Sequence, residues 1–440
     1  MIKTLTSAFK NKDIRKKLLY TLMMLVVIRI GSLLPIPGVD TEYFSTLLSG
    51  FNSGDLSYLS AFTGGSFEKM SLFALSITPY ITSSIIMQLL TIAIPKLEEM
   101  QKEGEDGRKK IASITRYVTI ALALIESIAM AVGFGRQGLI KDYKDMSTIH
   151  YVTCIIVVVA ALTAGSAVLM WIGERITEKG VGNGISIVLL INIISGMPSD
   201  FVTLYSTFVA NKSIARGVTV AVIIAAIVIA VVVLVVILQD GERRIPVQYS
   251  QKVAGRKTIG GQATNIPLKV NTAGVMPIIF ASSIMQFPVI IVQLFTSNSY
   301  EWTKYLSQSY WCRVQMPKYS IGLLLYIILV VVFAYFYTSI TFNPVQIADN
   351  LKKAGGVVPG ITPGRSTSEY LNKILNYIVF IGAVGLMIVA LIPIMCTGFF
   401  NASVSFGGTS IIIIVGVALE TMKQIESMMV NRNYRGFLSE

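Results

Sequence analysis

Apolar runs of about 20 residues recur along most of this chain, and they decide what it can fold into. A helix of this length crosses the hydrocarbon core of a bilayer, which is roughly 30 Å thick. The sequence therefore predicts an all-α polytopic membrane protein. Its ten expected transmembrane helices lie roughly at 18–35, 70–94, 111–134, 151–172, 184–207, 217–238, 273–295, 319–341, 374–397 and 407–429.

Charged residues are too scarce for the soluble alternative. They make up 14% of the chain, whereas a soluble domain carries about 25%, and 53% of the residues are hydrophobic. A soluble multi-domain protein would have to bury every apolar run without enough polar surface to cover them. The basic N-terminal stretch and the first apolar run are followed by no signal-peptide cleavage motif, so we expect the first span to be retained.

The positions of Lys and Arg predict how the spans are oriented. With the N-terminus inside, the inner segments hold 27 of the 37 basic residues, the outer segments hold 9, and Arg29 lies within a span. Cytoplasmic loops carry such an excess, so both termini are predicted to be cytoplasmic. The even number of spans permits two inverted halves of five, residues 1–197 and 217–440, joined by an outer hinge loop at 198–216. No residue-level repeat supports this division, which is a hypothesis.

Motifs for catalysis, cofactors and metals are missing from the sequence. Cys154, Cys312 and Cys396 form no C-x-x-C pair, and a single histidine, His150, cannot build a multi-histidine site. The glycine-rich "GVGNG" at 180–184 opens an expected span without a preceding strand, which argues against a dinucleotide site, and no G-x-x-x-x-G-K-[ST] motif occurs. We therefore predict a protein that is not an enzyme and has no cofactor, and whose work is powered by a partner or a gradient.

Ionisable residues inside the spans are few and dispersed. Arg29, Glu126 and Glu420 are the main ones, and Glu420 is near enough to the inner boundary to snorkel. A transporter coupled to protons or ions commonly keeps buried acids, because an intramembrane charge is costly and so usually functional. These residues do not cluster in the sequence, which argues against a transporter without excluding it. Arg29 is expected to neutralise backbone carbonyls or a neighbouring helix rather than to bind a substrate.

Two expected spans, the second and the seventh, are unusually polar and contain proline. Ser76–Leu90 carries Pro79 and several hydroxyl side chains, and Ala273–Pro288 carries Pro277 with two serines and a glutamine. A proline within a helix frees a carbonyl that needs a neighbour or water, while small and hydroxyl residues also suit ordinary helix packing. Packing would explain either span alone. Because the two occupy equivalent positions in the two halves, the pair predicts a shared polar seam.

The two long inner loops are candidate docking surfaces. Loop 239–270 holds six basic residues against two acids, and its "RRIPVQYSQ" and "GRKTIGGQ" predict a projecting hairpin with a basic tip. Loop 342–373 carries a short helix, Pro344–Ala354, and a turn-rich "VVPGITPG". The net charge of +13 is explained either by topology alone or by a basic surface that docks an anionic partner. Charge leaves both explanations open, and the length of the loops favours docking.

A half-length apolar segment precedes the second span. Leu56–Met70, "LSYLSAFTGGSFEKM", is too short to cross a bilayer, and Gly64 and Gly65 break it in the middle. Its apolar residues nevertheless require burial. The segment therefore needs a role that neither a span nor a solvated loop supplies.

Six motifs spread along the chain indicate one family. They are "PYITSSIIMQLL", "GNGISI", "ERRIPVQY", "NIPLKVNTAGVMPIIFASSI", "FNPVQIADNLKKAGG" and "FGGTS". Together, and over essentially the whole chain, they resemble the SecY family of bacterial protein-translocase subunits. The resemblance implies ten helices in two inverted, pseudo-symmetric halves around an hourglass pore. Unfolded secretory chains would pass through this pore, and an edge between spans two and seven would open to release hydrophobic segments into the lipid bilayer.

The same resemblance selects a pore ring. It implies a ring of six aliphatic residues, Ile77, Ile81, Ile185, Leu189, Ile279 and Ile413. Residues 77 and 81, like 185 and 189, are spaced i, i+4 and so share one helix face. Six aliphatic side chains converging at mid-membrane would form a constriction that dewets, resists ions and yields to a passing chain. Taken singly, each residue suits ordinary packing, and only the resemblance selects it.

A plug and a lateral gate are also implied by the resemblance. The half-length segment, residues 55–69, would be the plug, which folds back against the ring with Phe62 as its anchor and Gly64 and Gly65 as hinges. An element that moves is expected to be held by few strong contacts. The lateral gate is expected to include Thr82, Ile85 and Phe287.

The inner loops resemble the family's docking sites for the motor ATPase SecA and for the ribosome, with its RNA and protein at the exit tunnel. The expected main contacts are Arg243, Arg244, Arg256 and Lys257. The family's usual "GIRPG" reads "GITPG" here, so Thr362 replaces an arginine associated with motor coupling, and Arg365 nearby is a candidate substitute. The resemblance also implies SecE and SecG as membrane partners, secretory and membrane-protein chains as substrates, and a bacterial plasma membrane as the location.

Two other functional classes make different predictions. A small-solute transporter predicts clustered intramembrane acids and short inner loops, whereas a channel predicts a bare aliphatic constriction and two long projecting inner loops. The sequence has the second pattern. A purely structural scaffold accounts for neither the half-length segment nor the paired proline spans.

Overall fold

Ten helices of 16 or more residues among the described residues match the ten expected spans, one each. The computed structural model describes residues 9–50, 63–135, 139–140, 147–206, 214–249, 252–254, 257–259, 263–295, 300–313, 316–400 and 408–436. The ten helices are α2 (Lys12–Leu33), α5 (Thr78–Ala93), α7 (Glu105–Phe134), α8 (Thr148–Lys179), α9 (Gly184–Leu204), α10 (Ile214–Asp240), α11 (Met276–Phe295), α13 (Ile321–Thr341), α15 (Arg365–Phe400) and α16 (Gly408–Gly436). The helical, ten-span prediction is confirmed, with a small sheet added to it.

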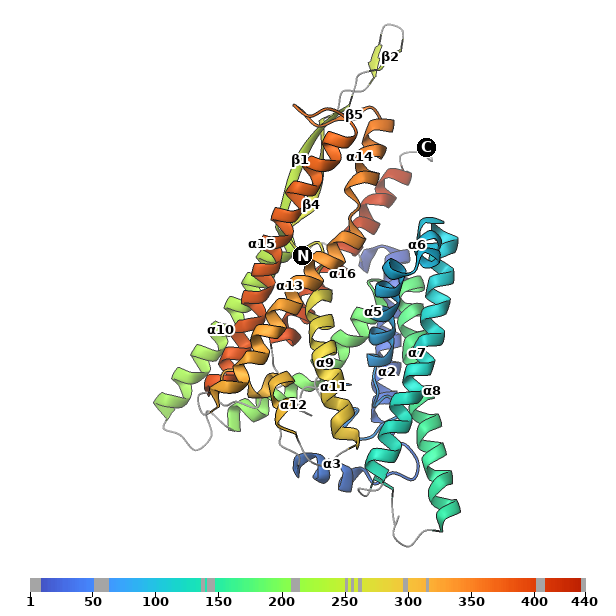
Figure 1. Ribbon diagram of the computed structural model, residues 1–440, viewed down its shortest axis with the longest axis vertical. Helices are drawn as coiled ribbons and strands as arrows, with labels where there is room; N and C mark the ends of the chain where they lie inside the picture. Colours follow the sequence, from blue (N-terminus) through green and yellow to red (C-terminus); the bar gives the residue numbers. More distant parts are fainter. Residues whose placement is uncertain are drawn as a thin grey trace.

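The long helices form two groups that stand side by side (Figure 1). In the first group α7 packs on α5 and α8, and α2 packs on α8. In the second group α15 packs on α10, α13 and α16. Two helices join the groups, because α9 contacts both α8 and α16, and α11 contacts both α13 and α7.

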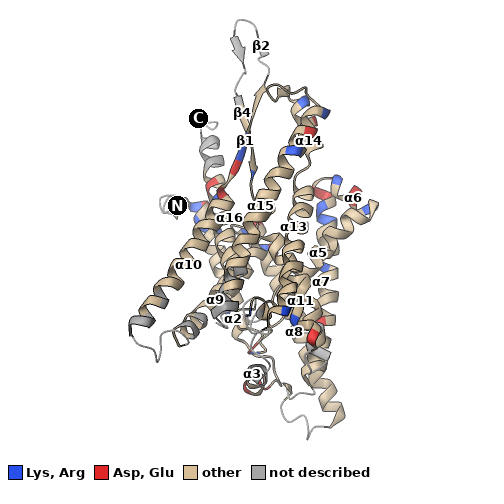
Figure 2. Cartoon of the chain, turned by 60° about the vertical axis from the view of Figure 1, so that its left-hand side comes forward, with Lys and Arg blue, Asp and Glu red and all other residues tan. Residues whose placement is uncertain are grey.

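Apolar surface and scarce charge show that the helical part suits a membrane. By length and composition, five helical stretches of the described chain can cross a membrane, or six if α5 and α6 (Pro95–Lys102), which bend by 99°, count as one span. α9 and α11 contain shorter apolar stretches. Side chains such as Ile125 and Ile229 stay 62% and 63% exposed, as lipid-facing residues do. Figure 2 shows Lys, Arg, Asp and Glu gathered mainly near helix ends and outside the helical middle.

The second span begins eight residues later than predicted. We expected helix from residue 70, but α5 begins at Thr78 and residues 64–77 form turns and an isolated bridge. Pro79 lies in the first turn of α5, where its missing amide hydrogen would have had no helical acceptor. Pro277 has the same place in α11, which follows turns at 270–275. Both prolines therefore start helices, and the prediction that they free carbonyls within the spans is wrong.

The turns before α5 are strained and tightly packed. Ser76 has a φ of 53°, a conformation that residues other than glycine rarely adopt. A Cβ added to Gly31 of α2 would lie 2.1 Å from the ring of Phe73. One added to Gly165 of α8 would lie 1.8 Å from the carbonyl oxygen of Leu72. Glycines on two neighbouring helices thus make room for these turns.

The two long inner loops meet in one antiparallel sheet. β1 (Glu242–Tyr249) pairs along its length with β4 (Ala263–Lys269), which confirms the predicted hairpin. β5 (Gly356–Val357), from the second loop, pairs with the other edge of β1, and the strand order is β4-β1-β5. The contact between the two loops was not predicted. β2 (Lys252–Ala254) and β3 (Lys257–Ile259) pair nearer the tip of the hairpin.

A short helix projects beside the sheet. α14 (Pro344–Lys353) confirms the expected helix, and Asn343 caps it, because its Oδ1 accepts hydrogen bonds from the amides of Val345 and Gln346 at 3.1 and 3.3 Å. The sheet and α14 lie at one end of the molecule, called the sheet side below (Figure 1). The opposite side carries α3 (Thr41–Gly50) and α12 (Glu301–Leu306), and the 3₁₀ turns η3 (Gln308–Tyr310) and η4 (Pro317–Ser320) follow α12.

The connection between α9 and α10 is shorter than the predicted outer hinge loop. α9 includes Pro198 and continues to Leu204, and α10 begins at Ile214. Helix therefore covers both ends of the range 198–216, and residues 207–213 lie outside the described part of the chain. The hinge and the division into halves on either side of it stay predictions.

The two largest clusters of buried apolar residues lie in the helical part of the described chain. We call the larger one the ring cluster, because it includes the predicted ring residues. Five of them are buried in it, and Ile185 packs against its edge; the five are Ile77, Ile81, Leu189, Ile279 and Ile413. The second, which we call the aromatic cluster, is centred on Phe44, Phe67 and Phe134, whose ring centroids lie 5.2, 5.8 and 6.4 Å apart in edge-to-face contacts. The two clusters lie on either side of the turns before α5, since Phe73 belongs to the first and Leu75 to the second.

Candidate functional site

The six predicted ring residues meet although they come from four different helices. Ile77 and Ile81 belong to the start of α5, Ile185 and Leu189 to α9, Ile279 to α11 and Ile413 to α16. Five of them are buried, from 0% exposed at Ile413 to 8% at Ile81, and only Ile185 is half-buried. The structure therefore assembles a continuous aliphatic contact where segments far apart in the sequence converge.

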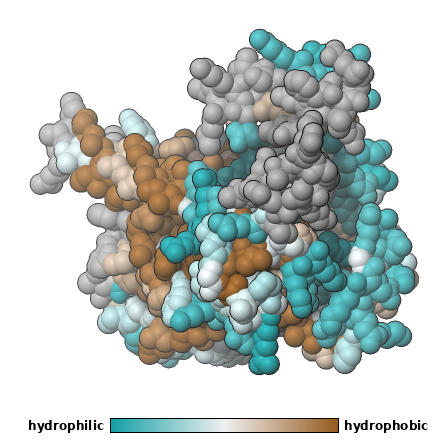
Figure 3. Space-filling model, turned by 90° about the horizontal axis from the view of Figure 1, so that it is seen from above, coloured by the Kyte–Doolittle hydropathy of each residue, from teal (hydrophilic) through white to brown (hydrophobic). Residues whose placement is uncertain are grey.

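A cavity of about 600 Å³ adjoins the ring cluster toward the sheet side. Four ring residues line it: Ile81, Ile185, Leu189 and Ile279. Ile77 and Ile413 do not line it, so the cluster extends beyond the end of the cavity. Viewed from the sheet side, hydrophilic residues border a small hydrophobic area near the centre of the molecule (Figure 3).

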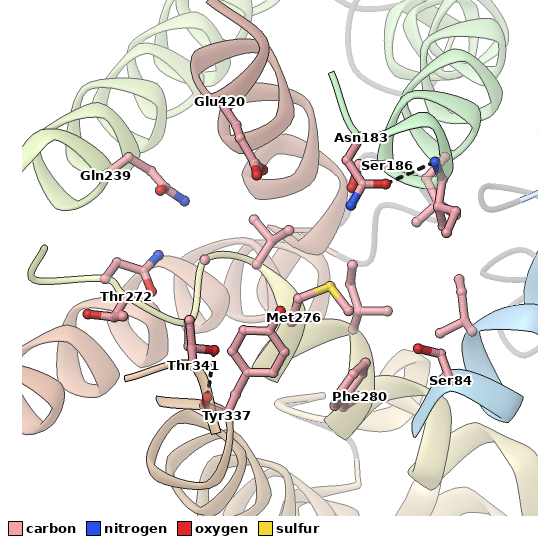
Figure 4. A pocket seen from close by; sticks show the side chains of 18 of the residues that line it. Ser84, Asn183, Ser186, Gln239, Thr272, Met276, Phe280, Tyr337, Thr341 and Glu420 are labelled. Carbon is pink, nitrogen blue, oxygen red and sulfur yellow. Dashed lines mark hydrogen bonds between the residues drawn. The ribbon is translucent and has the colours of Figure 1, made fainter. Parts of the chain in front are cut away.

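The walls of the cavity are polar but carry little charge. Figure 4 shows Gln239 of α10, Asn183 before α9 and Glu420 of α16 extending toward the open space. Apart from two tyrosines, the ionisable residues in the lining are Lys269, Glu420 and Lys423, and Lys423 Nζ lies 2.7 Å from Asp240 Oδ1. Hydroxyl and carboxamide groups make up the other polar lining: Tyr80, Ser84, Gln88, Asn183, Ser186, Gln239, Asn271, Thr272, Tyr337, Thr341 and Gln424.

The cavity suits binding or passage rather than chemistry. Among the residues that the structure describes, no group of three His, Cys, Asp or Glu side chains could hold a metal ion. Glu420 is the one carboxylate in the described lining. An aliphatic end next to polar walls with few charges offers no strong binding to any one type of side chain.

The predicted lateral-gate residues lie in different surroundings. Ile85 is 5% exposed within the ring cluster. Thr82 is half-buried, and its Oγ1 donates to the Thr78 carbonyl on its own helix at 3.1 Å. Phe287 is 42% exposed on α11. Helix α5 thus keeps Ile85 in the ring cluster, whereas Phe287 faces outward.

Only one end of the predicted plug is described. Phe62 lies outside the described residues, whereas Gly64 and Gly65 have φ values of 63° and 78°, which glycine adopts without strain. Phe67 is 4% exposed and belongs to the aromatic cluster, not to the ring cluster. A Cβ on Gly64 would lie 2.5 Å from Ser195 Oγ. For residues 63–69, the expectation of few strong contacts is therefore wrong.

Arg29 joins α2 to α9 beside Gly64. Its Nη1 donates to Ser195 Oγ at 2.9 Å, and that hydroxyl lies 3.4 Å from the Gly64 carbonyl oxygen and 2.7 Å from the Asn192 carbonyl oxygen. Asn192 Nδ2 donates to Ser76 Oγ at 3.0 Å. The prediction that Arg29 serves a neighbouring helix is confirmed. Sequence reasoning missed Ser195 and Asn192, because single polar residues in an apolar span carry no distinguishing pattern.

The predicted docking residues of the first loop lie on the sheet side. Arg243 and Arg244 are on β1, and the guanidinium of Arg244 lies 2.5 Å from Glu242 Oε1. This ion pair leaves Arg243 as the stronger candidate for an anionic partner. Lys257 begins β3 without a described side chain, and Arg256 lies outside the described residues.

The predicted docking residues of the second loop lie just before and at the start of α15. Thr362 and Arg365 are both exposed. Arg365 Nε donates to Glu369 Oε1 at 3.0 Å, four residues along the same helix. Both side chains of this ion pair are exposed, so the Arg365 guanidinium can exchange Glu369 for another anionic group at little cost in free energy.

Comparison with known proteins gives a consistent result. The SecY family model matches residues 71–422. The chain is 42% identical over 453 aligned residues to the protein translocase subunit SecY of Streptomyces galbus, with 100% of each chain covered. It is 41% identical over 445 residues to the subunit of the same name from Bacillus subtilis, again with 100% of each covered.

Solved structures share the fold at lower identity. A structure described as that of a protein conducting channel matches with a TM-score of 0.63 and 18% identity, and covers 94% of this chain and 93% of its own. Sec61 in the canine ribosome–channel complex from the endoplasmic reticulum matches with a TM-score of 0.58 and 16% identity, with 94% and 93% covered.

Proposed function

The chain belongs to the SecY family, and on that premise we propose that it is the central subunit of a protein-conducting channel. It passes unfolded secretory polypeptides across the membrane and releases hydrophobic segments sideways into the bilayer. The observation that carries this proposal is the meeting of six aliphatic side chains from four helices beside a cavity whose polar walls carry few charges. A small-solute site would instead gather charged or metal-binding groups.

The ring cluster is the proposed constriction. Aliphatic side chains do not hydrate, so a narrow passage lined by them excludes water and ions. They also hold no charge that would retain a passing chain. Because the contact between the four helices is made of side chains and not of backbone hydrogen bonds, it opens when the helices move apart.

The plug and the lateral gate follow from the same proposal. Residues 55–69 act as the plug, and the close contacts at Gly64 and Phe67 fasten its described end to α9 and the aromatic cluster. Thr82, Ile85 and Phe287 act as the gate between α5 and α11, and Ile85 links that gate to the constriction.

Energy for transport comes from partners in this proposal. The motor ATPase SecA and the ribosome dock on the sheet side, where Arg243, Arg244, Arg256 and Lys257 form one basic projection and the turn before α15 forms a second. The pairing of β5 with β1 supports a single docking surface, because it joins the two loops. SecE and SecG are the proposed membrane partners, and they cover part of the exposed apolar helix surface.

Location and orientation are inferred from charge and family. Similarity to bacterial relatives supports a bacterial plasma membrane. The excess of basic residues in the segments of the sheet side supports cytoplasmic termini. The cavity then opens toward the cytoplasm and is the entrance for the transported chain.

Site-specific crosslinking tests the proposed path. A photoreactive residue replaces Ile81 or Ile279, and a secretory chain stalled by a folded domain is engaged by the motor ATPase in membranes. We expect a crosslink that requires both the chain and ATP. Ile125, 62% exposed on α7, is the matched control position and should give none. An engaged chain that crosslinks at Ile125 but not at the ring positions would remove the proposed path and favour a transporter.

The departure at Thr362 gives a second test of docking. Thr362→Arg restores the family's usual residue at an exposed position, so it should leave the fold intact. ATP-driven transport with the native partner and with an arginine-adapted partner is then compared. Reduced transport with the native partner would indicate that this partner has adapted to threonine, and a large gain would indicate weak coupling in the native pair. Arg365→Ala in both backgrounds shows whether Arg365 substitutes for the missing arginine.

A further inference from the structure

Two carboxamide side chains that line the cavity hold buried polar atoms that make no hydrogen bond to any residue that the structure describes. Asn271 is 4% exposed, and neither its Nδ2 nor its Oδ1 has a partner. Gln88 leaves its buried Oε1 unpaired. Both residues line the cavity. Buried polar atoms are nearly always paired, and an unpaired one costs folding free energy, so their presence here requires a reason.

These two residues lie on different walls of the cavity, near the constriction. Gln88 is on α5, seven residues beyond Ile81 toward the sheet side, and Asn271 is in the turns that lead into α11. Helices α5 and α11 carry the ring residues Ile81 and Ile279. A chain that reaches the constriction from the cavity therefore passes both amides first.

Three more carboxamides belong to the same walls. Gln239 extends into the space from α10 (Figure 4). Among the described residues, Asn183 and Gln424 form hydrogen bonds through their side-chain oxygens, which accept from the amides of Ile185 and Gly182 at 3.1 and 2.6 Å. Their amino groups remain donors. These carboxamides thus offer uncharged donors and acceptors.

We propose that these carboxamides form a binding site for the main chain of an extended polypeptide, with Asn271 and Gln88 as its central members. The inference rests on the proposed function, because it names what the entrance recognises in the transported chain. A carboxamide has the same donor and acceptor as a peptide group, so it binds backbone irrespective of sequence. Charged walls would instead favour one class of side chain. The site steadies the chain at the entrance, while the aliphatic ring beyond it has no hydrogen bonds to offer.

The test varies the backbone of the transported chain and not its side chains. A reporter secretory chain carries a stretch of glycine or, in a semisynthetic twin, the same length of N-methylglycine, which lacks the amide hydrogen. A folded domain stalls either chain with the stretch at the cavity, as checked by crosslinking from Ser84. ATP is then removed, and the half-time for backward release is measured in membranes that hold the complete complex.

We expect the native channel to retain the glycine stretch about tenfold longer than the N-methylglycine stretch. Losing one hydrogen bond at the upper end of the usual net strength changes a dissociation constant by about this factor. Asn271→Leu should shorten retention of the glycine stretch and leave that of the N-methylglycine stretch unchanged. Asn376→Leu, which removes an exposed carboxamide outside the described cavity lining, should change neither.

Equal retention of the two stretches by the native channel would overturn the inference, and this comparison needs no variant. Asn271→Leu shortening both retentions equally would also overturn it, because that outcome indicates a structural role. If Asn271→Leu does not assemble, Gln88→Met takes its place with the same expectation. If a carrier chain without either stretch is not transported at all, the proposed function fails, and the inference falls with it.

Discussion

Helices α5 and α11 start in the same way and both contribute to the ring cluster, but the turns before them lie in different surroundings. Each follows a run of turns and has a proline in its first turn. The turns before α5 lie away from the sheet side, and residues 71–77 are buried except Leu72, which is half-buried. The turns before α11 adjoin the sheet, and they line the cavity with Thr272 and Gly274 half-buried.

The same helix start, turns followed by a proline in the first helical turn, therefore has two different structural results. Before α5, Gly31 and Gly165 allow neighbouring helices to press on the turns, and Asn192 bonds to the strained Ser76. Before α11, a Cβ on Gly382 of α15 would also lie close to the turns, 2.3 Å from the Val270 carbonyl oxygen, but these turns border the cavity. There the side-chain amide of Asn271 makes no hydrogen bond to any residue that the structure describes. One start seals the side away from the sheet by packing, and the other keeps the sheet side open.

The largest expected effect is that of a substitution against the tightly packed turns before α5, which we call the sealed start. Gly165→Ala places a Cβ 1.8 Å from the Leu72 carbonyl oxygen, a backbone atom that cannot yield without moving the turns. We expect the free energy of unfolding, measured by SDS titration in mixed micelles, to fall by about 3 kcal/mol. Gly196→Ala on α9 is the matched control, because a Cβ there meets nothing within 4 Å. It should be neutral or gain up to about 1 kcal/mol from helix propensity. Equal effects of the two variants would contradict the packing account.

The second largest effect is expected from removing the charge of Arg29, which lies beside Gly64 and the turns before α5. Arg29→Met deletes the hydrogen bond to Ser195 Oγ, and we expect a loss of about 2 kcal/mol, in the range for hydrogen bonds to charged groups. Protease cleavage within 51–69 should become faster, because Gly64 loses part of its support. Arg29→Lys keeps the charge and should lose less. Unchanged cleavage in Arg29→Met would show that Ser195 holds Gly64 without Arg29.

A pair of glycines with the same φ sharpens the comparison directly. Gly64 and Gly274 both have a φ of 63°, but a Cβ on Gly64 meets Ser195 Oγ at 2.5 Å and one on Gly274 meets nothing within 4 Å. Gly274→Ala should cost about 1 kcal/mol from backbone strain alone. Gly64→Ala should cost about 1 kcal/mol more, from overpacking. Equal unfolding free energies for the two variants would indicate that the turns before α5 are not tightly packed at Gly64.

The smallest expected effect is on the open start. A Cβ on Gly416 of α16 would approach Val275 Cγ1 at 2.7 Å and Gln239 Nε2 at 3.3 Å, and both are side-chain atoms able to rotate away. Gly416→Ala should therefore change the free energy of unfolding by less than about 1 kcal/mol, because helix propensity offsets the crowding. A loss as large as that of Gly165→Ala would show that the walls of the cavity are as rigid as the sealed start.

Sequence periodicity and charge were sufficient for the architecture but not for these details. Long apolar runs identify a membrane helix irrespective of its neighbours, so all ten helices were predictable. The start of α5 was not, because the turns before it are fixed by distant contacts: Ser76, in the left-handed conformation, accepts a hydrogen bond from Asn192, 116 residues away. The pairing of β5 with β1 was also hidden, since a strand of two residues has no pattern of its own.

The candidate site shows the same limit. Ile279 and Ile413 look like any aliphatic residue in an apolar span, and only family resemblance selected them; the structure brings them into one cluster with residues of α5 and α9. The unpaired amide of Asn271 could not be predicted, because whether a polar group finds a partner depends on side chains from several helices. Phe62 stays a prediction, since it lies outside the described residues.

The pairing of β5 with β1 has a mechanical consequence. β1 follows α10 directly, β4 leads into the turns before α11, and β5 lies between α14 and α15. A force applied at either projecting loop is therefore transmitted through one three-stranded sheet rather than taken up by a flexible loop. The pairing of β4 ends at Lys269, two residues before Asn271. A force on the loops outside the membrane is therefore transmitted to the wall of the cavity that an entering chain must pass.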